Sequence, residues 1–245
     1  MSTFNDYGII LHNYKLSESD KILSIYTKNN GLVKAVCKGI RKLSSSFGGK
    51  VEQLSCCYFQ FAKGKNLYTI CECEQVNSFS LLRSNLIHIN CGILFLEVVN
   101  RFSYEGEFES ELIYNLLYSS LDKLQKHSDP YLLTTEFLLE FLSIHGYKPQ
   151  LNTCVACSMQ IKSYDTKITY PYSAQLGGLL CTNCSKTVDY KAVSHNILEV
   201  LQSLENKKNE EINKEDIRPT LNLLREHLDL RAKDTIKSFE LLLSL

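Results

Sequence analysis

Two cysteine pairs, Cys154-Val-Ala-Cys157 and Cys181-Thr-Asn-Cys184, determine how the second half of this 245-residue chain folds. Each Cys-x-x-Cys turn aims two sulfurs inward, and four thiolates at about 2.3 Å complete the tetrahedral shell of Zn²⁺. The 23 residues between the pairs contain two short apolar runs, 168–172 and 179–180, and a Gly-Gly turn. The spacing therefore predicts a four-cysteine zinc hairpin over residues 154–190, with a structural Zn²⁺.

Two weaker hypotheses for these four cysteines remain open: a site that binds metal weakly or not at all, and a redox-active pair of dithiols. The redox hypothesis lacks the βαβ context that a thioredoxin-like motif requires. A catalytic zinc is disfavoured, because such a site keeps an open position for water and four thiolates leave none. His145 and His195 flank the cysteines in the sequence, but a complete shell gives them no role as ligands.

On the N-terminal side, residues 1–80 have the pattern of a small β domain. Five short runs rich in Ile, Val, Tyr, Phe and Cys alternate with turn signals. The runs are residues 7–14, 21–27, 32–37, 56–62 and 67–73. Five strands in a segment of this length predict a five-stranded OB-fold barrel.

Helical periodicity replaces the strand pattern in residues 81–153 and 191–245, on either side of the cysteine hairpin. Leucine-rich stripes that include Leu86 and Leu112 are expected in the core of a helical bundle. Residues 234–245 predict a final short helix. The expected fold class is α+β multidomain: an OB-fold barrel followed by a helical bundle that carries the zinc hairpin.

The charge is balanced overall but unevenly distributed. The chain has 27 Lys+Arg and 27 Asp+Glu, which excludes a uniformly basic nucleic-acid coat protein. Residues 21–51 nevertheless hold seven basic and no acidic residues, whereas residues 81–153 hold five basic and nine acidic ones. Cations, hydroxyls and glycines in residues 39–50 suit a loop that contacts phosphates.

The β domain is therefore the candidate DNA-binding part, and a solvated basic face is the alternative. The candidate DNA-binding residues are Lys34, Lys38, Arg41, Lys42 and Lys50. Barrels of this type also stack bases on aromatic rings. The aromatic candidates are Tyr14, Tyr26, Phe47, Tyr58, Phe59 and Tyr68.

No motif of an active site, a secretion signal or a membrane span is visible in the sequence. The most apolar segment, residues 131–144, is interrupted by Glu136 and Glu140. Gly48-Gly49-Lys50 lacks the other residues of a phosphate-binding P-loop. We therefore expect a cytoplasmic protein that is not an enzyme, in which the six remaining cysteines are core thiols. The acidic residues Glu105, Glu107, Glu109 and Glu111 are expected on a solvated loop and helix start.

Several stretches, spread in order over nearly the whole chain, give it a resemblance to a known family. They are GIILH (8–12), SESDKIL (17–23), YTKNNGL (26–32), KGIRK (38–42), FLSIHGY (141–147), GGLLC (177–181) and IRP (217–219). No single piece is diagnostic, but the combination resembles the RecO family of bacterial recombination mediators.

The resemblance implies an N-terminal OB-fold, a helical C-terminal domain and a zinc module. It implies a non-enzymatic protein of the bacterial cytoplasm and nucleoid that binds single- and double-stranded DNA and anneals complementary strands. Such a protein helps to load RecA recombinase onto gaps coated by single-stranded-DNA-binding protein. Its implied partners are RecR, in some members RecF, and the acidic C-terminal tail of the single-strand binder.

Residue by residue, the resemblance carries DNA contact over to Lys38, Arg41 and Lys42, while Lys34 and Lys50 rest on the charge pattern alone. It carries metal binding over to the four cysteines of the hairpin. The alternative function is a zinc-stabilised adaptor that binds only proteins, with the basic segment contacting an acidic tail. A metalloenzyme would need an open metal site.

Overall fold

The computed structural model describes residues 2–42, 45, 47–161, 169–206, 212–232 and 235–244. The chain divides into two compact units. The first unit comprises Met1–Pro130 and Ile236–Leu245, and the second comprises Tyr131–Thr235. The domain boundaries expected from the sequence, at residues 80, 153 and 190, stay predictions.

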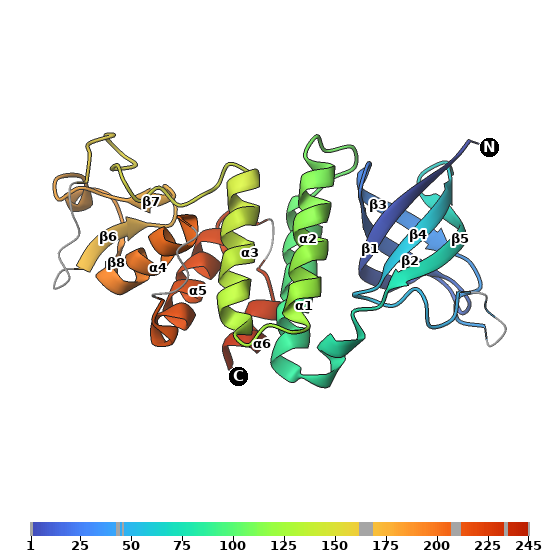
Figure 1. Ribbon diagram of the computed structural model, residues 1–245. Helices are drawn as coiled ribbons and strands as arrows, with labels where there is room; N and C mark the ends of the chain where they lie inside the picture. The colour runs from blue at the N-terminus through green and yellow to red at the C-terminus, as the bar shows by residue number, and fades with distance from the viewer. Residues whose placement is uncertain are drawn as a thin grey trace. The chain divides into compact units, whose positions relative to one another are not determined.

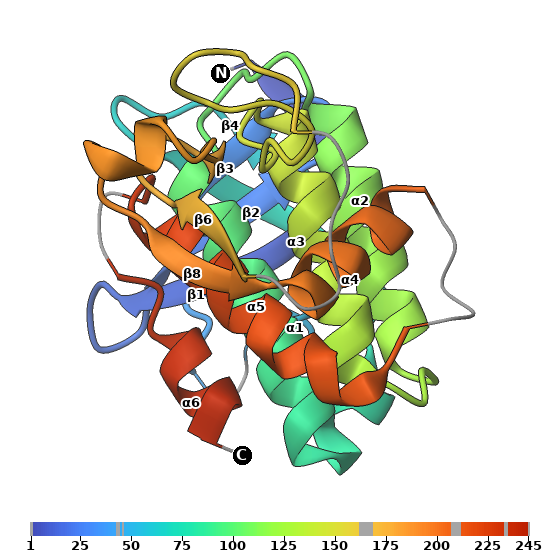
Figure 2. The same cartoon turned by 90° about the vertical axis from the view of Figure 1, so that its left-hand side faces the viewer.

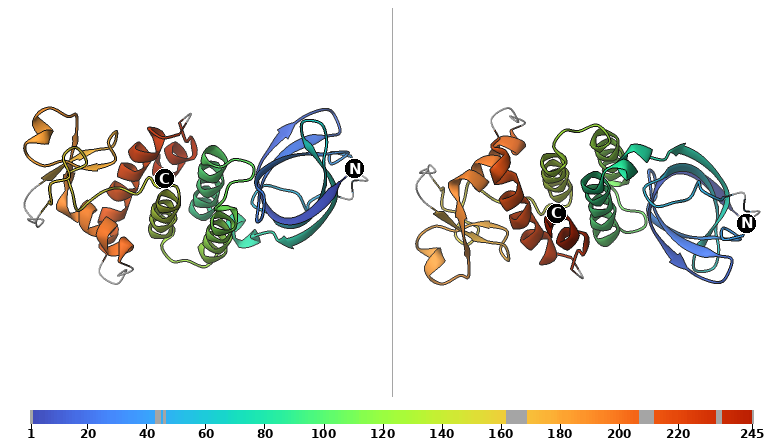
Figure 3. Two further views of the ribbon diagram at one scale, coloured as in Figure 1. Left: turned by 90° about the horizontal axis from the view of Figure 1, so that it is seen from above. Right: turned by 90° about the horizontal axis from the view of Figure 1, so that it is seen from below.

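A closed five-stranded barrel forms the start of the first unit (Figure 1). Its strands are β1 (Thr3–Lys15), β2 (Lys21–Thr27), β3 (Gly31–Cys37), β4 (Cys56–Ala62) and β5 (Tyr68–Asn77). They are joined in the order β1-β2-β3-β5-β4, and β4 closes the ring by pairing with β1. Figure 3 shows the ring of strands end-on. The expected α+β class with an OB-like barrel is confirmed.

Strand β1 reaches both of its neighbours because it is long and bulged. Residues 3–9 pair with β4, and residues 8–15 pair with β2, with a shift in register between Ile10 and His12. The backbone groups at this bulge bond to the loop that precedes β4. Ile10 N–H donates to the Ser55 carbonyl, and Leu54 N–H donates to the Ile10 carbonyl. The bulge therefore anchors the end of the β3–β4 loop.

Alternation of apolar and polar residues decides which side chains fill the barrel. In β3, Val33, Ala35 and Cys37 are buried inside, while Lys34 between them is exposed. Aromatic side chains from β4, Phe59 and Phe61, complete the interior. Gly8 is required in β1, since a Cβ there would lie 2.5 Å from a side-chain carbon of Ile25. The core is thus fixed by strand periodicity and by one close approach.

The expectation that all six remaining cysteines lie in the core is wrong for one of them. Cys37, Cys56, Cys57 and Cys91 are buried, and the partly buried Cys73 packs against the barrel core, but Cys71 is exposed. Cys71 directly follows Ile70 on β5, and Ile70 takes the inward position, so the Cys71 side chain points outward.

Four helical segments complete the first unit: η1 (Ser80–Ser84), α1 (Leu86–Phe102), α2 (Ser110–Leu124) and α6 (Ser238–Ser244). The Asn85 side chain caps α1 by accepting from the N–H groups of Ile87 and His88. Glu97 of α1 accepts from the backbone N–H groups of Lys237 and Ser238, at the start of α6. The C-terminal segment is therefore held against α1. The expected final helix is present, although residues 234 and 245 lie outside the described ranges.

The expectation that Leu86 and Leu112 belong to the bundle core is wrong. Their exposed fractions are 62% and 53%. Helix α1 instead buries Leu94, Phe95 and Val98, a face rotated away from Leu86. A leucine stripe can follow either edge of a wide apolar face, so periodicity alone did not distinguish the buried edge from the exposed one.

The second unit combines helices with a small sheet. Its helices are α3 (Pro130–Ile144), α4 (His195–Glu205) and α5 (Lys214–Asp229), with the short turn η2 (Cys184–Lys186). Its strands are β6 (Thr169–Ser173), β7 (Gly178–Leu179) and β8 (Lys191–Ser194), in the order β7-β6-β8. Figure 2 shows the strands beside α4 and α5. The apolar runs expected between the cysteine pairs correspond to β6 and β7, although Ile168 lies outside the described residues.

A buried histidine links this sheet to α5. His227 is fully buried; its Nε2 lies 2.7 Å from the Tyr147 carbonyl oxygen and its Nδ1 lies 2.6 Å from the Tyr172 hydroxyl. A carbonyl only accepts, so Nε2 carries the proton and Nδ1 accepts from Tyr172. Burial, reinforced by the Arg231 charge, lowers the pKa of His227 to about 4. The neutral ring is therefore part of the folded state.

The second unit should lose stability as the pH falls from about 6.5 to 4. In the unfolded chain this histidine binds a proton at its ordinary pKa, whereas in the folded chain His227 stays neutral until about pH 4. Protonation of the unfolded chain therefore lowers the unfolding free energy; this loss is absent above the ordinary histidine pKa and reaches its full size near pH 4. It amounts to about 3 kcal/mol of unfolding free energy. Urea unfolding at several pH values should show this slope in the wild type and not in His227→Gln. The exposed His12→Gln is the control, and a His227→Gln variant with the full wild-type slope would contradict the assignment.

Candidate nucleic-acid interface and metal site

All five candidate DNA-binding residues of the barrel are exposed. Lys34 points outward from β3, and Lys38, Arg41 and Lys42 follow directly where that strand ends. Lys50 lies farther along the same loop, beyond residues 43, 44 and 46, which are outside the described ranges. The loop thus presents its cations in two parts, one at the end of β3 and one before β4.

The first part of this loop is bonded to the turn between β1 and β2. The Arg41 N–H donates to the Ser19 carbonyl, and the Arg41 guanidinium donates to the Ser17 carbonyl. The Gly39 N–H donates to Oδ1 of Asp20 at 2.8 Å. Gly39 adopts a left-handed φ of 68°, which a residue with a side chain rarely adopts. Three bonds therefore hold the turn that carries Lys38, Arg41 and Lys42.

Asp20 is ionised in this arrangement. The Gly39 N–H and the Ser19 hydroxyl both donate to its carboxylate, and together they lower the pKa of Asp20. Its carboxylate also faces the charge of Lys38. Asp20 directly precedes the acid-free stretch that begins at Lys21, and it organises the basic turn.

The second part of the loop is fixed to the barrel through Lys50. Its carbonyl oxygen accepts from the Gln75 side chain at 3.3 Å and lies 3.4 Å from the Cys57 sulfur. The charged end of Lys50 stays exposed. Lys50 is therefore held by its backbone while its ammonium faces solvent.

The strand register adds a cation that the sequence analysis did not select. Lys15 pairs with Lys21 across β1 and β2, and Lys21 pairs with Cys37, the neighbour of Lys38. Lys15 is exposed, so it belongs to the same end of the barrel as the basic turn. The sequence could have indicated Lys15, because it directly follows the strand predicted over residues 7–14 and stands just before a turn.

Two of the aromatic candidates are wrong as base-stacking residues. Tyr26 and Phe59 are fully buried, because they point into packed regions of the first unit. Tyr14 and Tyr58 are exposed to 44% and 37%, and Tyr7, which the sequence analysis missed, packs beside Tyr58 with ring centroids 4.8 Å apart. Exposed rings are therefore present on β1 and β4.

The acidic stretch before α2 is only partly solvated. Glu105, Glu109 and Glu111 are exposed as expected, but Glu107 is buried, with a 5% exposed fraction. Burial raises the pKa of Glu107, and contacts with Tyr26 and Ser103 oppose that rise. The expectation of four solvated acids is wrong at this residue, since the loop folds back onto the β2–β3 hairpin.

The four cysteines of the two pairs meet at one point of the second unit. Their sulfur atoms all lie within 4.8 Å of one another, and those of Cys157 and Cys181 are 3.8 Å apart. Ligands at about 2.3 Å in a tetrahedron would place sulfurs about 3.8 Å apart, so the cluster fits a metal ion of that kind. The cluster can therefore hold a metal.

Local backbone structure aims these sulfurs. The Cys154 N–H donates to the Met159 carbonyl, and the Val155 N–H donates to the Leu179 carbonyl, which joins the first pair to β7. The second pair follows β7 directly and ends in the turn η2. Two turns that are far apart in the sequence are thereby placed side by side.

The electrostatics of the cluster favour a bound cation. Burial opposes ionisation of Cys154, but the N–H groups of Cys181, Ala156 and Cys157 outweigh it and lower the pKa of that thiol to about 6. Hydrogen bonds to the sulfurs of Cys181 and Cys157 raise the pKa of Cys184, because they hold its proton in place, and repulsion from the charge of Cys154 raises it further. A metal ion removes this repulsion and allows all four sulfurs to ionise.

Comparison with known proteins agrees with this architecture. Residues 1–79 match the family model "Recombination protein O N terminal", and residues 83–240 match "Recombination protein O C terminal". The chain belongs to the RecO family. Membership in this family supports a role as a mediator of DNA repair by recombination, with DNA and recombination proteins as general partners. None of the helices in the described ranges has the length and apolar character that crossing a membrane requires.

Curated relatives of the RecO family cover most of the chain. A "DNA repair protein RecO" of Dehalococcoides mccartyi is 32% identical over 82% of this chain and 78% of its own. A second "DNA repair protein RecO", from Rubrobacter xylanophilus, is 31% identical over 75% of this chain and 72% of its own length. One of a Thermoanaerobacter species is 28% identical over 95% and 96%. The similarity therefore extends through both units.

The cysteine cluster predicts one tightly bound metal ion per chain. Cys181→Ser should remove that metal and lower the urea midpoint of the second unit, because binding energy at such a site is folding energy. Elemental analysis of the purified protein and urea titration measure the two effects. Cys71→Ser, an exposed cysteine of the barrel, is the matched control. A wild-type chain without metal, or a Cys181→Ser chain with the full complement, would refute the site.

Proposed function

We propose that this chain binds single- and double-stranded DNA through the basic end of its barrel and anneals complementary strands. In this proposal it also helps to load RecA onto gaps coated by single-stranded-DNA-binding protein. The observation that carries the proposal is the turn after β3, where three hydrogen bonds hold exposed cations in place. The proposed DNA contacts are Lys34, Lys38, Arg41, Lys42 and Lys50.

Annealing by such a surface needs no chemical catalysis. Cations neutralise the phosphates of two strands and release their counterions, and base pairing supplies the free energy. Phosphate contacts carry no sequence information, so the same surface serves single and double strands of any sequence. The exposed Tyr14 and Tyr58 are available for stacking with unpaired bases.

The remaining surfaces suit protein partners better than DNA. Exposed Glu105, Glu109 and Glu111 would repel phosphates, and Phe108 beside them is 95% exposed. We propose RecR, and in some settings RecF, as partners of these surfaces. The acidic C-terminal tail of single-stranded-DNA-binding protein, which the same carboxylates would repel, is proposed as a partner of a cationic part of the chain. We also propose that the metal in the cysteine cluster is Zn²⁺ with a structural role, since four thiolates leave no open position.

Removal of three cations from the basic turn should weaken binding to any DNA sequence. In the triple variant Lys38→Gln, Arg41→Gln, Lys42→Gln, we expect affinity for single strands to fall about tenfold or more at low salt. The slope of log affinity against log salt should flatten by about 2, because each lost phosphate contact contributes roughly 0.7. Fluorescence anisotropy at several salt concentrations measures both. Strand annealing, with and without single-stranded-DNA-binding protein, should slow in parallel.

A second triple variant controls for the change in net charge. Lys63, Lys65 and Lys126 are exposed in the same unit but belong to other segments of the chain than the basic turn, and their replacement by Gln should leave the slope unchanged. An unchanged slope in the first variant would contradict the proposed DNA surface. Absence of any DNA binding by the wild type at low salt would instead favour the protein-only adaptor.

Asp20 provides a test in which net charge and loop position have opposite effects. Asp20→Ala removes a negative charge beside the cations, so charge alone would tighten DNA binding. It also removes the acceptor that holds the Gly39 N–H, and we expect the freed turn to bind DNA about three- to tenfold more weakly. Glu18→Ala, an exposed acid of the same turn, isolates the effect of charge. Equal tightening in both variants would show that Asp20 does not position the turn.

A further inference from the structure

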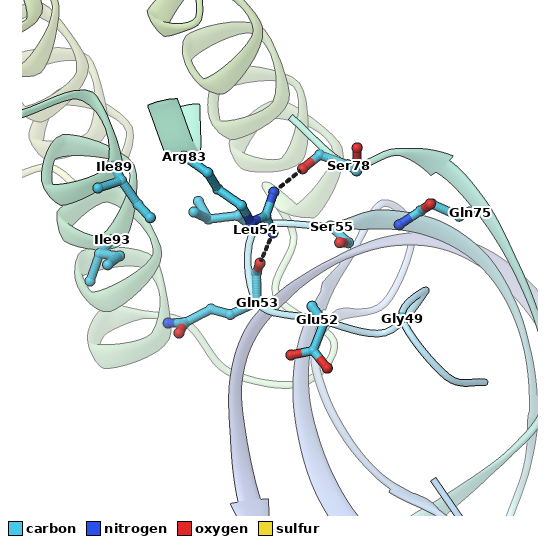
Figure 4. A pocket seen from close by; sticks show the side chains of 10 residues that line it. All are labelled: Gly49, Glu52, Gln53, Leu54, Ser55, Gln75, Ser78, Arg83, Ile89 and Ile93. Atoms are coloured by element: carbon cyan, nitrogen blue, oxygen red, sulfur yellow. Dashed lines mark hydrogen bonds between the residues drawn. The ribbon is translucent and has the colours of Figure 1, made fainter. Parts of the chain in front are cut away.

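A pocket of about 530 Å³ lies in the first unit beside the second part of the basic loop (Figure 4). Its lining comes from the β3–β4 loop, the end of β5, η1 and α1. The lining includes Glu52, Ser55, Gln75, Arg83, Ile89 and Ile93. The volume is in the range of small-ligand sites. None of the five proposed DNA contacts is among these residues, so the pocket is a separate feature of the same loop.

The pocket is built from segments that are held in place. Arg83 donates to the Ser78 carbonyl at 2.7 Å and to the Gln53 carbonyl at 3.0 Å, and Figure 4 shows it joining the two segments. Leu54 has a left-handed φ of 72°, an uncommon conformation for a residue with a branched side chain. Strained backbone of this kind persists only where the surroundings impose it, and it is concentrated at binding sites.

One polar group in the lining has no partner. The hydroxyl of Ser55 is buried, with the residue 1% exposed, and no described residue makes a hydrogen bond to it. A buried hydroxyl without a partner costs free energy, so the described residues leave one hydrogen-bonding group at the base of the lining unsatisfied. The Gln75 amide is exposed beside it, and Ile89 and Ile93 form an apolar wall from one face of α1.

The charges around the pocket select a neutral ligand with polar edges. Glu52 at the rim would repel a phosphate or an acidic peptide. Two of the Arg83 nitrogens already donate to carbonyl oxygens, so Arg83 does not offer a free bidentate anion site. Apolar walls with amide and hydroxyl groups suit a nucleobase, whose faces are apolar and whose edges donate and accept hydrogen bonds.

We propose that this pocket receives one unpaired base of a bound single strand, with the strand's phosphates on the side of Lys50. The inference rests on the proposed DNA-binding function and adds to it a site for the base. The link is direct, because the Gln75 amide in the lining bonds to the Lys50 carbonyl. A base in a duplex is stacked and paired, so its entry into the pocket would cost the free energy of unstacking and unpairing, which an unpaired base does not pay. The pocket therefore distinguishes single strands from duplexes, which the phosphate contacts do not.

The test uses the full chain and a thymine-tract oligonucleotide that carries one 2-aminopurine, as a single strand and as a duplex of the same length. Ile89→Glu places a charge in the pocket wall. We expect it to lower single-strand affinity about tenfold, to abolish the change in 2-aminopurine emission on binding, and to leave duplex affinity unchanged. Leu86→Glu makes the same charge change at an exposed position outside the lining, and it should keep wild-type behaviour.

A second variant, Ile93→Ala, truncates a partly buried side chain of the pocket wall and keeps the test valid if Ile89→Glu fails to fold. It should reduce the emission change and spare duplex binding. Wild-type single-strand affinity and emission in both pocket variants would overturn the pocket while leaving the proposed function intact. Equal losses for single strands and duplexes would also overturn it, because they would indicate a displaced basic loop. If the wild-type protein binds neither the single strand nor the duplex, the proposed DNA-binding function itself is refuted.

Discussion

The bulge in β1 shapes the whole of the barrel. This strand pairs with β4 along residues 3–9 and with β2 along residues 8–15, and the register shift between Ile10 and His12 bends it between the two. Beside this shift, backbone groups of Ile10 bond to Leu54 and Ser55. Barrel closure and the position of the candidate base pocket therefore have one origin. The loop between β3 and β4 can be long and rich in cations because its far end is anchored at this point.

The net charge of the chain is zero because a basic surface at one end of the barrel is offset by an acidic surface at the start of α2. Cations gather where β1 and β3 end and β2 begins, and Asp20 at this place positions the turn through the Gly39 N–H. Acids gather on the segment before α2 and on the first turn of α2, where Glu111 pairs with Lys28 at 3.1 Å. A net charge of zero is thus compatible with DNA binding, because local potential and not total charge attracts a phosphate backbone.

The second unit is organised around its cysteine hairpin in a comparable way. Tyr172 of β6 pairs with Leu179 of β7, two residues before Cys181, and its hydroxyl bonds to the buried His227 of α5. The cysteine cluster is therefore connected to the helices through one strand pair and one neutral histidine. A metal at the cluster would restrain the turns, and the histidine restrains the sheet, so that two weak local structures support each other.

The amino-acid sequence alone was enough to predict the five barrel strands, the long helices and the four-cysteine cluster, because periodicity of two, periodicity of 3.6 and Cys-x-x-Cys spacing are local properties. It also indicated the basic turn, since Lys38, Arg41 and Lys42 are close neighbours in the chain. It did not predict β8. The packed structure was needed to show that Leu86 and Leu112 are exposed, that Tyr26, Phe59 and Glu107 are buried, and that Asp20 holds Gly39. It also joined Lys15 to the basic end and assembled the pocket from four elements. Burial and partner choice depend on which distant segment packs against a residue, and local sequence does not encode that contact.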